Sequence, residues 1–203
     1  MRIAFYCPLS PLDKPGVSGD VTIARDLFHF FLEKGHKPSI ASEFISTRVD
    51  QRPWRWPRAL KAMRQVREKR RSADCWFSYR SYYKAPDLLG PLFAAPDKPY
   101  FIFAGTYASN RRKKLRSRAG YELNRKALLA ADHIFTNQQE NHRHLLRLLP
   151  EQRVTYIPPG IRSMNFKPCP KQGKRLREQL GLQGGPVVVT AAMFRKGVKT
   201  EGV

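Results

Sequence analysis

Acidic residues are scarce in this sequence. Its 203 residues include 16 Asp and Glu against 38 Lys and Arg, which gives a formal net charge of +22. Such an excess produces a positive potential over much of the surface and favours an anionic partner. Nucleic acid, an anionic membrane leaflet and a phosphorylated small molecule all satisfy this condition, and composition does not choose among them.

Cysteines and long apolar runs are also scarce. Cys7, Cys75 and Cys169 are odd in number and widely spaced, without the spacing of metal ligands. We therefore expect reduced thiols, no disulfide and no metal site. No segment approaches the roughly 20 apolar residues that span a bilayer, and the N-terminus lacks the pattern of a signal peptide. These features predict a cytoplasmic protein.

The first 36 residues read as one strand, one loop and one helix. They do not contain the G-x-G-x-x-G dinucleotide fingerprint. Residues 2–7 are apolar on both faces, which is typical of a buried parallel strand. A loop at 8–19, rich in Pro and Gly, precedes a helical pattern at 20–34, and Gly35 stands where a left-handed C-cap is expected. This order predicts the opening of a doubly wound α/β domain, in which ligands lie outside the carboxyl ends of the strands.

The later segments continue the same alternation. Strands are predicted at 37–42, 74–79, 100–104, 132–137, 153–157 and 187–192, and helices at 58–71, 86–94, 121–130, 138–149 and 174–180. The fold class is therefore α/β: a Rossmann-like open parallel sheet of about six strands with helices on both faces, followed by a C-terminal stub. The predicted divisions are a domain at 1–161, a linker with a short helix at 162–185, and the first strand and loop of another domain at 186–203.

Cations and aromatic residues gather where two predicted strands end. Tyr79, Arg80, Tyr82 and Lys84 follow one strand and Tyr107 follows the next. Two further segments, 58–71 and 111–118, are strongly basic and are interpreted as facing an anionic membrane. Solvated cations and strand-end core aromatics are the alternative interpretation of these residues.

A basic nucleic-acid-binding α/β module is an alternative function. The net charge and the mixture of aromatics and cations at 79–84 favour it. Against it, the sequence has no RNA-recognition, helix-turn-helix or zinc motif, so nucleic acid is ranked below the other partners.

Several segments, taken in order, resemble the family 4 glycosyltransferases of GT-B fold. They are Arg-Ile-Ala-Phe, the Pro and Gly loop, Glu-Lys-Gly-His, Ala-Ala-Asp-His-Ile-Phe-Thr-Asn, Val-Thr-Tyr-Ile-Pro-Pro-Gly-Ile and Pro-Val-Val-Val-Thr-Ala-Ala-Met-Phe-Arg-Lys-Gly. The resemblance covers nearly the whole chain. It implies that residues 1–161 are the acceptor-side Rossmann-like domain, and that the donor-binding domain is cut off after its first strand.

The resemblance also implies a function and a set of contacts. The parent enzyme would transfer a hexosyl unit from a nucleotide sugar to a lipid-linked or cell-surface glycan, without a metal or other cofactor, in the cytoplasm and at the inner face of the plasma membrane. Donor-diphosphate contacts are expected from Arg195 and Lys199, with Lys196 as an alternative register, and from Gly16, Ser18 and Gly19, whose loop otherwise merely connects strand and helix. Acceptor contacts are expected from Tyr79, Arg80, Tyr82, Lys84 and Tyr107.

Two departures from the family pattern leave the catalytic residues unassigned. The loop after the fourth strand reads Gly105-Thr106-Tyr107 where the family often has a His. The acidic pair that contacts the donor sugar has no counterpart before Val203. The 203-residue chain by itself is therefore expected to be inactive.

Overall fold

The computed structural model describes residues 1–15, 18–110, 114–160, 168–182 and 184–189. The chain divides into two compact units, Met1–Pro159 and Gly160–Val203, which are described separately.

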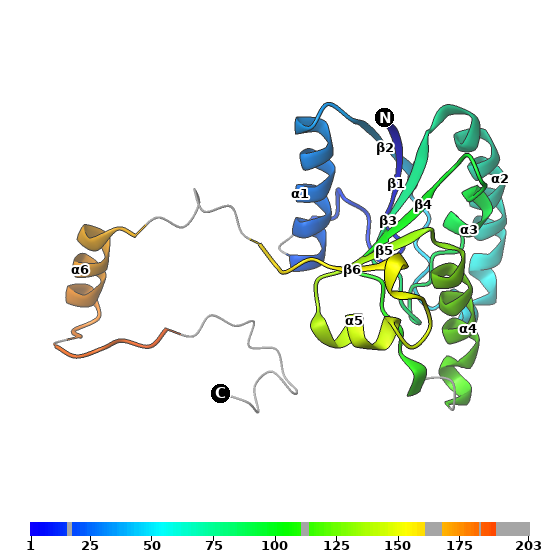
Figure 1. Ribbon diagram of the computed structural model, residues 1–203. Coiled ribbons are helices and arrows are strands. Elements are labelled where there is room, and N and C mark those ends of the chain that lie inside the picture. Colours follow the sequence, from blue (N-terminus) through cyan, green and yellow to red (C-terminus); the bar gives the residue numbers. More distant parts are fainter. Residues whose placement is uncertain (16–17, 111–113, 161–167, 183, 190–203) are drawn as a thin grey trace. The chain divides into compact units, whose positions relative to one another are not determined.

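The first unit contains a six-stranded parallel sheet, which confirms the predicted fold class (Figure 1). Its strands are β1 (Arg2–Tyr6), β2 (Lys37–Ser42), β3 (Cys75–Tyr79), β4 (Tyr100–Phe103), β5 (His133–Thr136) and β6 (Val154–Tyr156). Its helices are α1 (Gly19–Glu33), α2 (Trp56–Ser72), α3 (Gly90–Phe93), α4 (Leu115–Ala130) and α5 (Gln139–Leu145), with short 3₁₀ turns at Val49–Gln51, Pro53–Arg55 and Glu151–Arg153.

The strand order is β2-β1-β3-β4-β5-β6, and every neighbouring pair is parallel. The chain leaves β1 toward one edge of the sheet and returns to β3 on the other side of β1. The sheet therefore has its topological switch point between β1 and β3, where open α/β sheets bind ligands outside the carboxyl ends of the strands.

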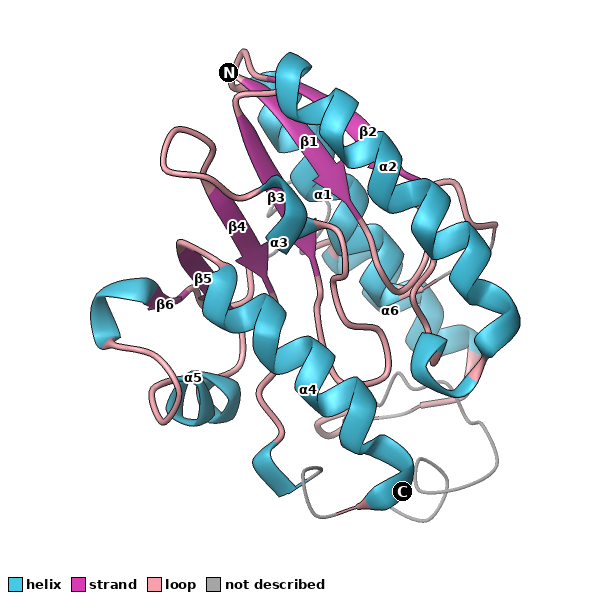
Figure 2. Cartoon of the chain, turned by 90° about the vertical axis from the view of Figure 1, so that its right-hand side faces the viewer, coloured by secondary structure: helices cyan, strands magenta, loops and turns pink. Residues whose placement is uncertain are grey.

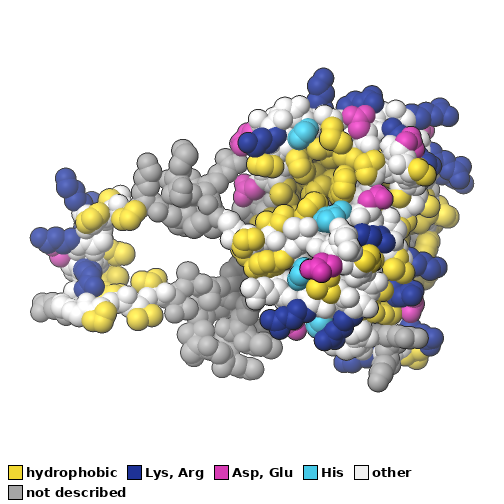
Figure 3. Space-filling model, viewed as in Figure 1, with side chains coloured by type: hydrophobic (Ala, Val, Ile, Leu, Met, Phe, Trp, Pro, Cys, Tyr) yellow, Lys and Arg dark blue, Asp and Glu magenta, His cyan; other side chains and the backbone are white. Residues whose placement is uncertain are grey.

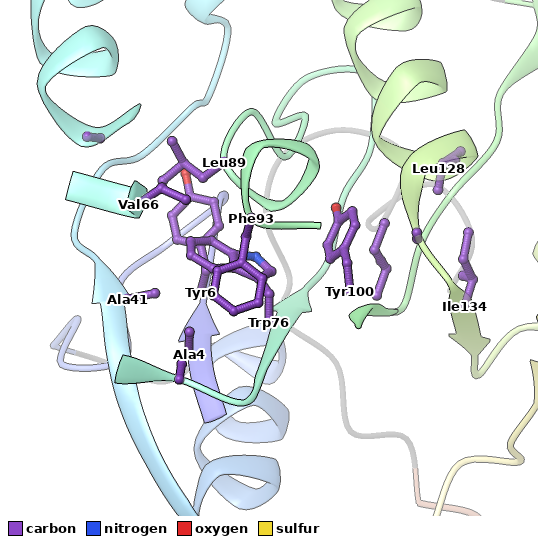
Figure 4. Packing of buried hydrophobic residues seen from close by; sticks show 14 of the residues in the cluster. Ala4, Tyr6, Ala41, Val66, Trp76, Leu89, Phe93, Tyr100, Leu128 and Ile134 are labelled. Atoms are coloured by element: carbon purple, nitrogen blue, oxygen red, sulfur yellow. The ribbon is translucent and has the colours of Figure 1, made fainter. Parts of the chain in front are cut away.

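Successive side chains of each strand point to opposite faces of the sheet, and each face has its own hydrophobic core. On one face Tyr6, Trp76 and Phe93 pack with residues of α2, α3 and α4 (Figure 4). On the other face Phe5 and Phe77 pack against α1. The helices thus cover both faces of the sheet, with α1 opposite α2, α3 and α4 (Figure 1, Figure 2).

The end of α1 confirms the predicted C-cap at Gly35. This residue has φ +75°, and its amide donates to the Leu32 carbonyl oxygen over 3.0 Å. The amide of His36 donates to the Phe31 carbonyl oxygen over 2.9 Å, and the two side-chain rings are in contact. These bonds form a Schellman motif, which ends the helix and turns the chain into β2.

Three local predictions are wrong. The helix predicted at 86–94 shrinks to α3, because the preceding residues bond to a buried carboxylate, described below. The helix predicted at 121–130 begins earlier, because α4 starts at Leu115 and includes the basic residues Arg116 and Arg118. In α2 the helical spacing of Leu60, Met63 and Val66 predicts the apolar stripe, but the buried residues are Ala59, Ala62 and Val66, and Leu60 is 52% exposed. The buried side of α2 therefore carries small residues, and Leu60 lies on the exposed side of the helix.

The second unit contains helix α6 (Pro170–Gln179), which begins earlier than the predicted 174–180. The described residues 187–189 of the predicted last strand are in no strand, and all three are exposed. The rest of that stretch lies outside the described residues, so the assignment of 186–203 to a donor domain stays a prediction.

Candidate functional site

The carboxyl ends of β1 and β3 meet the N-terminus of α1 at the switch point. The cavity directly between them measures about 10 Å³ and is lined by Cys7, Leu9, Ser10, Asp20, Val21, Ala24 and Tyr79. This is room for about one water molecule. A ligand at this edge therefore has to contact the rim of the cavity rather than enter it.

Arg80 is a charged, partly exposed group on that rim, and several contacts hold it in place. Its backbone has φ +67°, its amide donates to the Phe103 carbonyl oxygen over 2.7 Å, and its guanidinium forms an ion pair with Asp20 of α1. The same guanidinium lies 5.6 Å from the ring centroid of Tyr82. About a third of the side chain is exposed, so a ligand oxygen can reach a cation that is already oriented.

A second left-handed residue stands beside Arg80. Ala104, which directly follows β4, has φ +56°, and its amide donates to the Phe135 carbonyl oxygen over 2.8 Å. A non-glycine residue in this conformation costs about 1–3 kcal/mol, and such residues cluster at functional sites. Two of them at adjacent strand ends make this edge the candidate site.

Tyr82 and Lys84 belong to a tight turn. The amide of Ala85 donates to the Tyr82 carbonyl oxygen over 2.9 Å, and the amide of Arg48 donates to the Lys84 carbonyl oxygen over 2.6 Å. The Lys84 ammonium lies 5.6 Å from the ring centroid of Tyr83. Cation and ring therefore lie side by side twice at residues 80–84, once at Arg80 and Tyr82 and once at Lys84 and Tyr83.

A buried carboxylate, Asp87, follows this turn in the chain and links β3, β4 and the start of α3. Asp87 is 1% exposed and accepts hydrogen bonds from the amides of Leu89 and Gly90, at 2.8 and 2.9 Å, and from the Tyr100 hydroxyl at 2.7 Å. The hydroxyl of Ser78 also donates to it. Such full hydrogen bonding allows a carboxylate to be buried. The sequence offered no periodic signal for this network, so it was missed.

A second polar bridge ties the turn to α4 and to the loop after β4. The Ser81 hydroxyl donates to Asn124 Oδ1, and Asn124 Nδ2 donates to the Thr106 carbonyl oxygen, both over 2.8 Å. The Thr106 amide donates to the Ser81 carbonyl oxygen over 3.0 Å. The loops that follow β3 and β4 are therefore held together along one edge of the sheet.

Two of the predicted acceptor residues, Tyr79 and Tyr107, are not on the exposed part of the rim that carries Arg80 and Tyr82. Tyr79 is 4% exposed and stacks on Phe103 at 6.0 Å, so it belongs to the core. Burial raises the pKa of its hydroxyl, which therefore stays protonated at neutral pH. Tyr107 instead pairs with Tyr121 in a separate pocket between α4 and the segment after α5.

The predicted donor contacts are only partly described. Ser18 is the N-cap residue of α1 but makes no capping side-chain hydrogen bond, and no heavy atom lies within 4 Å of the position a Cβ would take at Gly19. Backbone can thus be approached closely there. Gly16, Arg195, Lys196 and Lys199 lie outside the described residues.

The cysteines offer no nucleophile at this edge. Burial raises the pKa of Cys7 to about 12 and, together with the charge of Asp74, that of Cys75 to about 11. Both thiols therefore stay protonated at neutral pH. Within the described residues no group of three or more His, Cys, Asp or Glu side chains is arranged to hold a metal ion.

A larger groove on the first unit lies elsewhere, between the edge strand β2 and α2. It measures about 750 Å³ and is lined by Ile40–Ile45, Arg55, Arg58, Lys61, Ala62, Gln65, Glu68 and Lys69. Cations outnumber acids in this lining. The amphipathic pattern of α2 predicted a basic outer face, but it did not predict that other residues of the helix line a groove.

Comparison with known proteins supports the fold. No protein-family model and no curated protein matches the chain. The crystal structure of Anabaena Alr3699/HepE in complex with UDP is similar with a TM-score of 0.52 and 17% identity, over 89% of this chain and 50% of that one. Its complexes with UDP and glucose and with UDP-glucose give TM-scores of 0.48 and 0.47, at 16% and 17% identity and the same coverage.

At this identity the likeness establishes the fold alone, a Rossmann-like α/β fold of the kind found in GT-B glycosyltransferases. The chain spans about half the length of the solved structure that it matches.

Proposed function

We propose that the first unit is the acceptor-side domain of a family 4 glycosyltransferase. The enzyme would transfer a hexosyl unit from a nucleotide sugar to a lipid-linked or cell-surface glycan precursor. The observation that carries this proposal is the rim of the switch point, where Arg80 and Tyr82 lie together on a fold that matches a solved structure containing UDP. An aromatic ring can stack on a sugar face, and a guanidinium can bind a phosphate through two parallel hydrogen bonds.

In the proposed reaction the oxygen of an acceptor hydroxyl bonds to the anomeric carbon of the donor, the hydroxyl proton is released to solvent, and the nucleoside diphosphate leaves with the electrons of the broken C–O bond. Arg195 and Lys199, with Lys196 as the alternative, would stabilise the charge that develops on the leaving group. Ser18 and Gly19, together with Gly16, would allow close approach of backbone to phosphate. On the acceptor side, the roles fall to Arg80, Tyr82 and Lys84.

Titration with a soluble glycolipid tests the acceptor assignment. The probe is glucose joined through a diphosphate to a short isoprenyl chain, and binding is followed by NMR of the isotope-labelled 203-residue protein. We expect saturable shifts at residues 80–84, a loss of affinity of roughly tenfold in Arg80→Ala, and partial recovery in Arg80→Lys, because an ammonium keeps the charge but not the planar fork.

Arg143→Ala, an exposed change on α5, is the matched control and should bind the probe like the wild type. Equal affinity in Arg80→Ala and Arg143→Ala would show that the probe responds to net charge only, and would overturn the acceptor assignment.

We also propose that α2 brings the protein to the anionic inner face of the plasma membrane. Its outer side carries Arg64, Arg67 and Arg71, and Trp54 and Leu60 beside it are 70% and 52% exposed. Figure 3 shows Lys and Arg side chains around the rim of one face of the molecule. Each cation near such a surface contributes on the order of 1 kcal/mol. Among the described helices, none is long and apolar enough to cross a bilayer.

Cosedimentation with vesicles tests the role of α2. The wild type should bind vesicles that contain phosphatidylserine and not neutral ones, and binding should weaken with salt. Reversing the charge of Arg64 and Arg67 should abolish binding, whereas reversing Arg143 and Arg147 of the α5 region should reduce it only slightly. Equal losses in the two double variants would contradict a docking face on α2.

A further inference from the structure

A second pocket lies at the same edge of the sheet as Arg80 but is built from other elements. It measures about 420 Å³ and is lined by Tyr107, Tyr121, Glu122, Arg125 and Leu148. Sites for small molecules in proteins commonly fall between about 300 and 1,000 Å³. The pocket therefore has the volume of a ligand site, and its five lining residues decide which ligand fits.

Two phenol groups form one wall of the pocket. The hydroxyl oxygens of Tyr107 and Tyr121 are 3.0 Å apart, and the ring centroids are 6.0 Å apart with planes tilted by 35°. Burial, followed by the hydrogen bond to Tyr107, raises the pKa of Tyr121 to about 12, so its hydroxyl remains protonated at neutral pH. When one hydroxyl donates to the other, one O–H donor and further acceptor lone pairs remain for a ligand.

The charges of the pocket cancel. Glu122 and Arg125 are one helical turn apart on α4, their closest side-chain atoms are 3.7 Å apart, and each side chain is about 40% exposed. So loose and exposed a pair contributes little to stability, and both groups can turn toward a ligand. On a chain with a net charge of +22, a lining with one carboxylate and one guanidinium does not favour an anion.

This chemistry fits a neutral molecule that carries many hydroxyls. Sugar hydroxyls both donate and accept, so they can bond to the phenols, the carboxylate and the guanidinium at once. The aromatic rings and Leu148 offer apolar surface to the C–H face of a sugar ring. A phosphate would face the Glu122 carboxylate, and a cation would face Arg125.

The pocket is also linked to the proposed acceptor rim. Tyr107 directly follows Thr106, and Arg80 directly precedes Ser81; the Thr106 amide donates to the Ser81 carbonyl oxygen over 3.0 Å. Asn124 of α4, three residues after Tyr121, bonds to both of these segments. One polar bridge thus fixes the rim and the pocket relative to each other.

We propose that this pocket binds a neutral hexose unit of the acceptor glycan, separate from the phosphate-bearing part that Arg80 contacts. The inference rests on the proposed function for the glycan nature of the ligand. It assigns binding roles to Tyr121, Glu122 and Arg125, and it gives Tyr107 a place in this pocket rather than beside Tyr82.

The test uses the methyl glycosides of glucose, galactose and mannose, with NMR of protein labelled at its eight tyrosines. At least one glycoside should produce saturable shifts of the Tyr107 and Tyr121 signals. Tyr121→Phe should weaken binding by roughly five- to tenfold, because a ligand hydroxyl loses its partner. Glu122→Gln and Arg125→Ala are exposed changes that leave the core intact, and each should weaken binding at least threefold. Lys126→Ala, on the exposed side of α4, is the matched control and should have no effect.

Absence of saturable shifts at Tyr107 and Tyr121 with all three glycosides overturns the inference, as does equal binding by Glu122→Gln, Arg125→Ala and Lys126→Ala. Tighter binding of glucose 1-phosphate than of methyl glucoside at these tyrosines would also overturn it. The glycolipid titration at Arg80 is a separate measurement. If the glycolipid shifts the Arg80 signals but no glycoside shifts those of Tyr107 and Tyr121, only this inference is wrong. If a glycoside shifts the tyrosine signals but the glycolipid does not shift those of Arg80, the proposed acceptor rim is wrong and the pocket remains a sugar-binding site.

Discussion

Gly120 of α4 allows the helix to contact the Tyr82–Ala85 turn, and adding a single methyl group there should disturb both. A Cβ built at Gly120 would lie 2.2 Å from the carbonyl oxygen of Tyr83 and 3.1 Å from Asp50 Oδ2. Because Cβ atoms essentially never approach heavy atoms closer than 3.0 Å, the two backbones would have to separate by about 0.8 Å, the difference between 3.0 and 2.2. That movement also lengthens the hydrogen bond from the Gly120 amide to Asp50 Oδ2, now 3.2 Å.

The magnitude follows from two opposing effects. Overpacking of this kind costs about 1–3 kcal/mol, whereas replacing a mid-helix glycine by alanine contributes about 1 kcal/mol of helix propensity. Since a carbonyl oxygen of the backbone cannot swing aside like a side chain, we take the upper part of the first range. Gly120→Ala should then lower the free energy of unfolding by about 1–2 kcal/mol, and Tm by roughly 2–8 °C.

Urea denaturation and thermal melting of the purified chain measure this effect. The matched control is Gly19→Ala at the first turn of α1, where no heavy atom lies within 4 Å of the added Cβ; it should be neutral or slightly stabilising. In Gly120→Ala the NMR signals of residues 82–85 should also shift, because the turn has to move. Wild-type or higher stability of Gly120→Ala would show that α4 and the turn are not in this close contact.

Three further outcomes follow from local contacts. Gly90→Ala should destabilise the protein by about 2–3 kcal/mol in urea, since its Cβ would lie 2.3 Å from the Tyr100 ring; a tolerated alanine would contradict this packing. Hydrogen bonds from Arg2 lower the pKa of Asp74 to about 2, so their stabilisation is present above about pH 4 and is lost as pH falls to about 2; the gap in unfolding free energy between wild type and Asp74→Asn should close over that window. Cys169 is exposed and should react with iodoacetamide in the native protein, whereas buried Cys7 should react only after unfolding, as followed by mass spectrometry.

The strands and long helices could be predicted because their signals are local. Apolar runs bounded by Pro and Gly indicated all six strands of the sheet, and Gly35 indicated the end of α1. In these parts local propensity and tertiary packing favour the same structure.

Other features depend on contacts between residues far apart in sequence. Helix α3 does not extend back to residue 86, because the carboxylate of Asp87 accepts hydrogen bonds from the amides of Leu89 and Gly90 and from the Tyr100 hydroxyl. Which side of α2 is buried, and with it the exposure of Leu60, likewise depends on tertiary packing. The hydrophobic periodicity of the sequence predicts neither the short α3 nor the exposure of Leu60.

The candidate site was predictable in part for the same reason. Cations and rings at 80–84 were adjacent in sequence, so their clustering on the rim could be expected. That Asp20 would pair with Arg80 depends on the tertiary fold, since 60 residues separate them. Tyr107 was assigned to the rim because it follows the neighbouring strand, but its ring turns toward Tyr121, whose place on α4 gave no sign of a pocket.

The most direct test of the acceptor rim compares the glycolipid probe with single-stranded DNA of equal charge, by calorimetry on wild type and Arg80→Ala. If the rim recognises a phosphate-linked sugar, the wild type should bind the glycolipid, Arg80→Ala should lose roughly tenfold in affinity for it, and any DNA binding should be the same in both proteins. Tighter binding of DNA than of the glycolipid by the wild type, together with an unchanged glycolipid affinity in Arg80→Ala, would contradict the proposed glycosyltransferase function and favour a nucleic-acid-binding module.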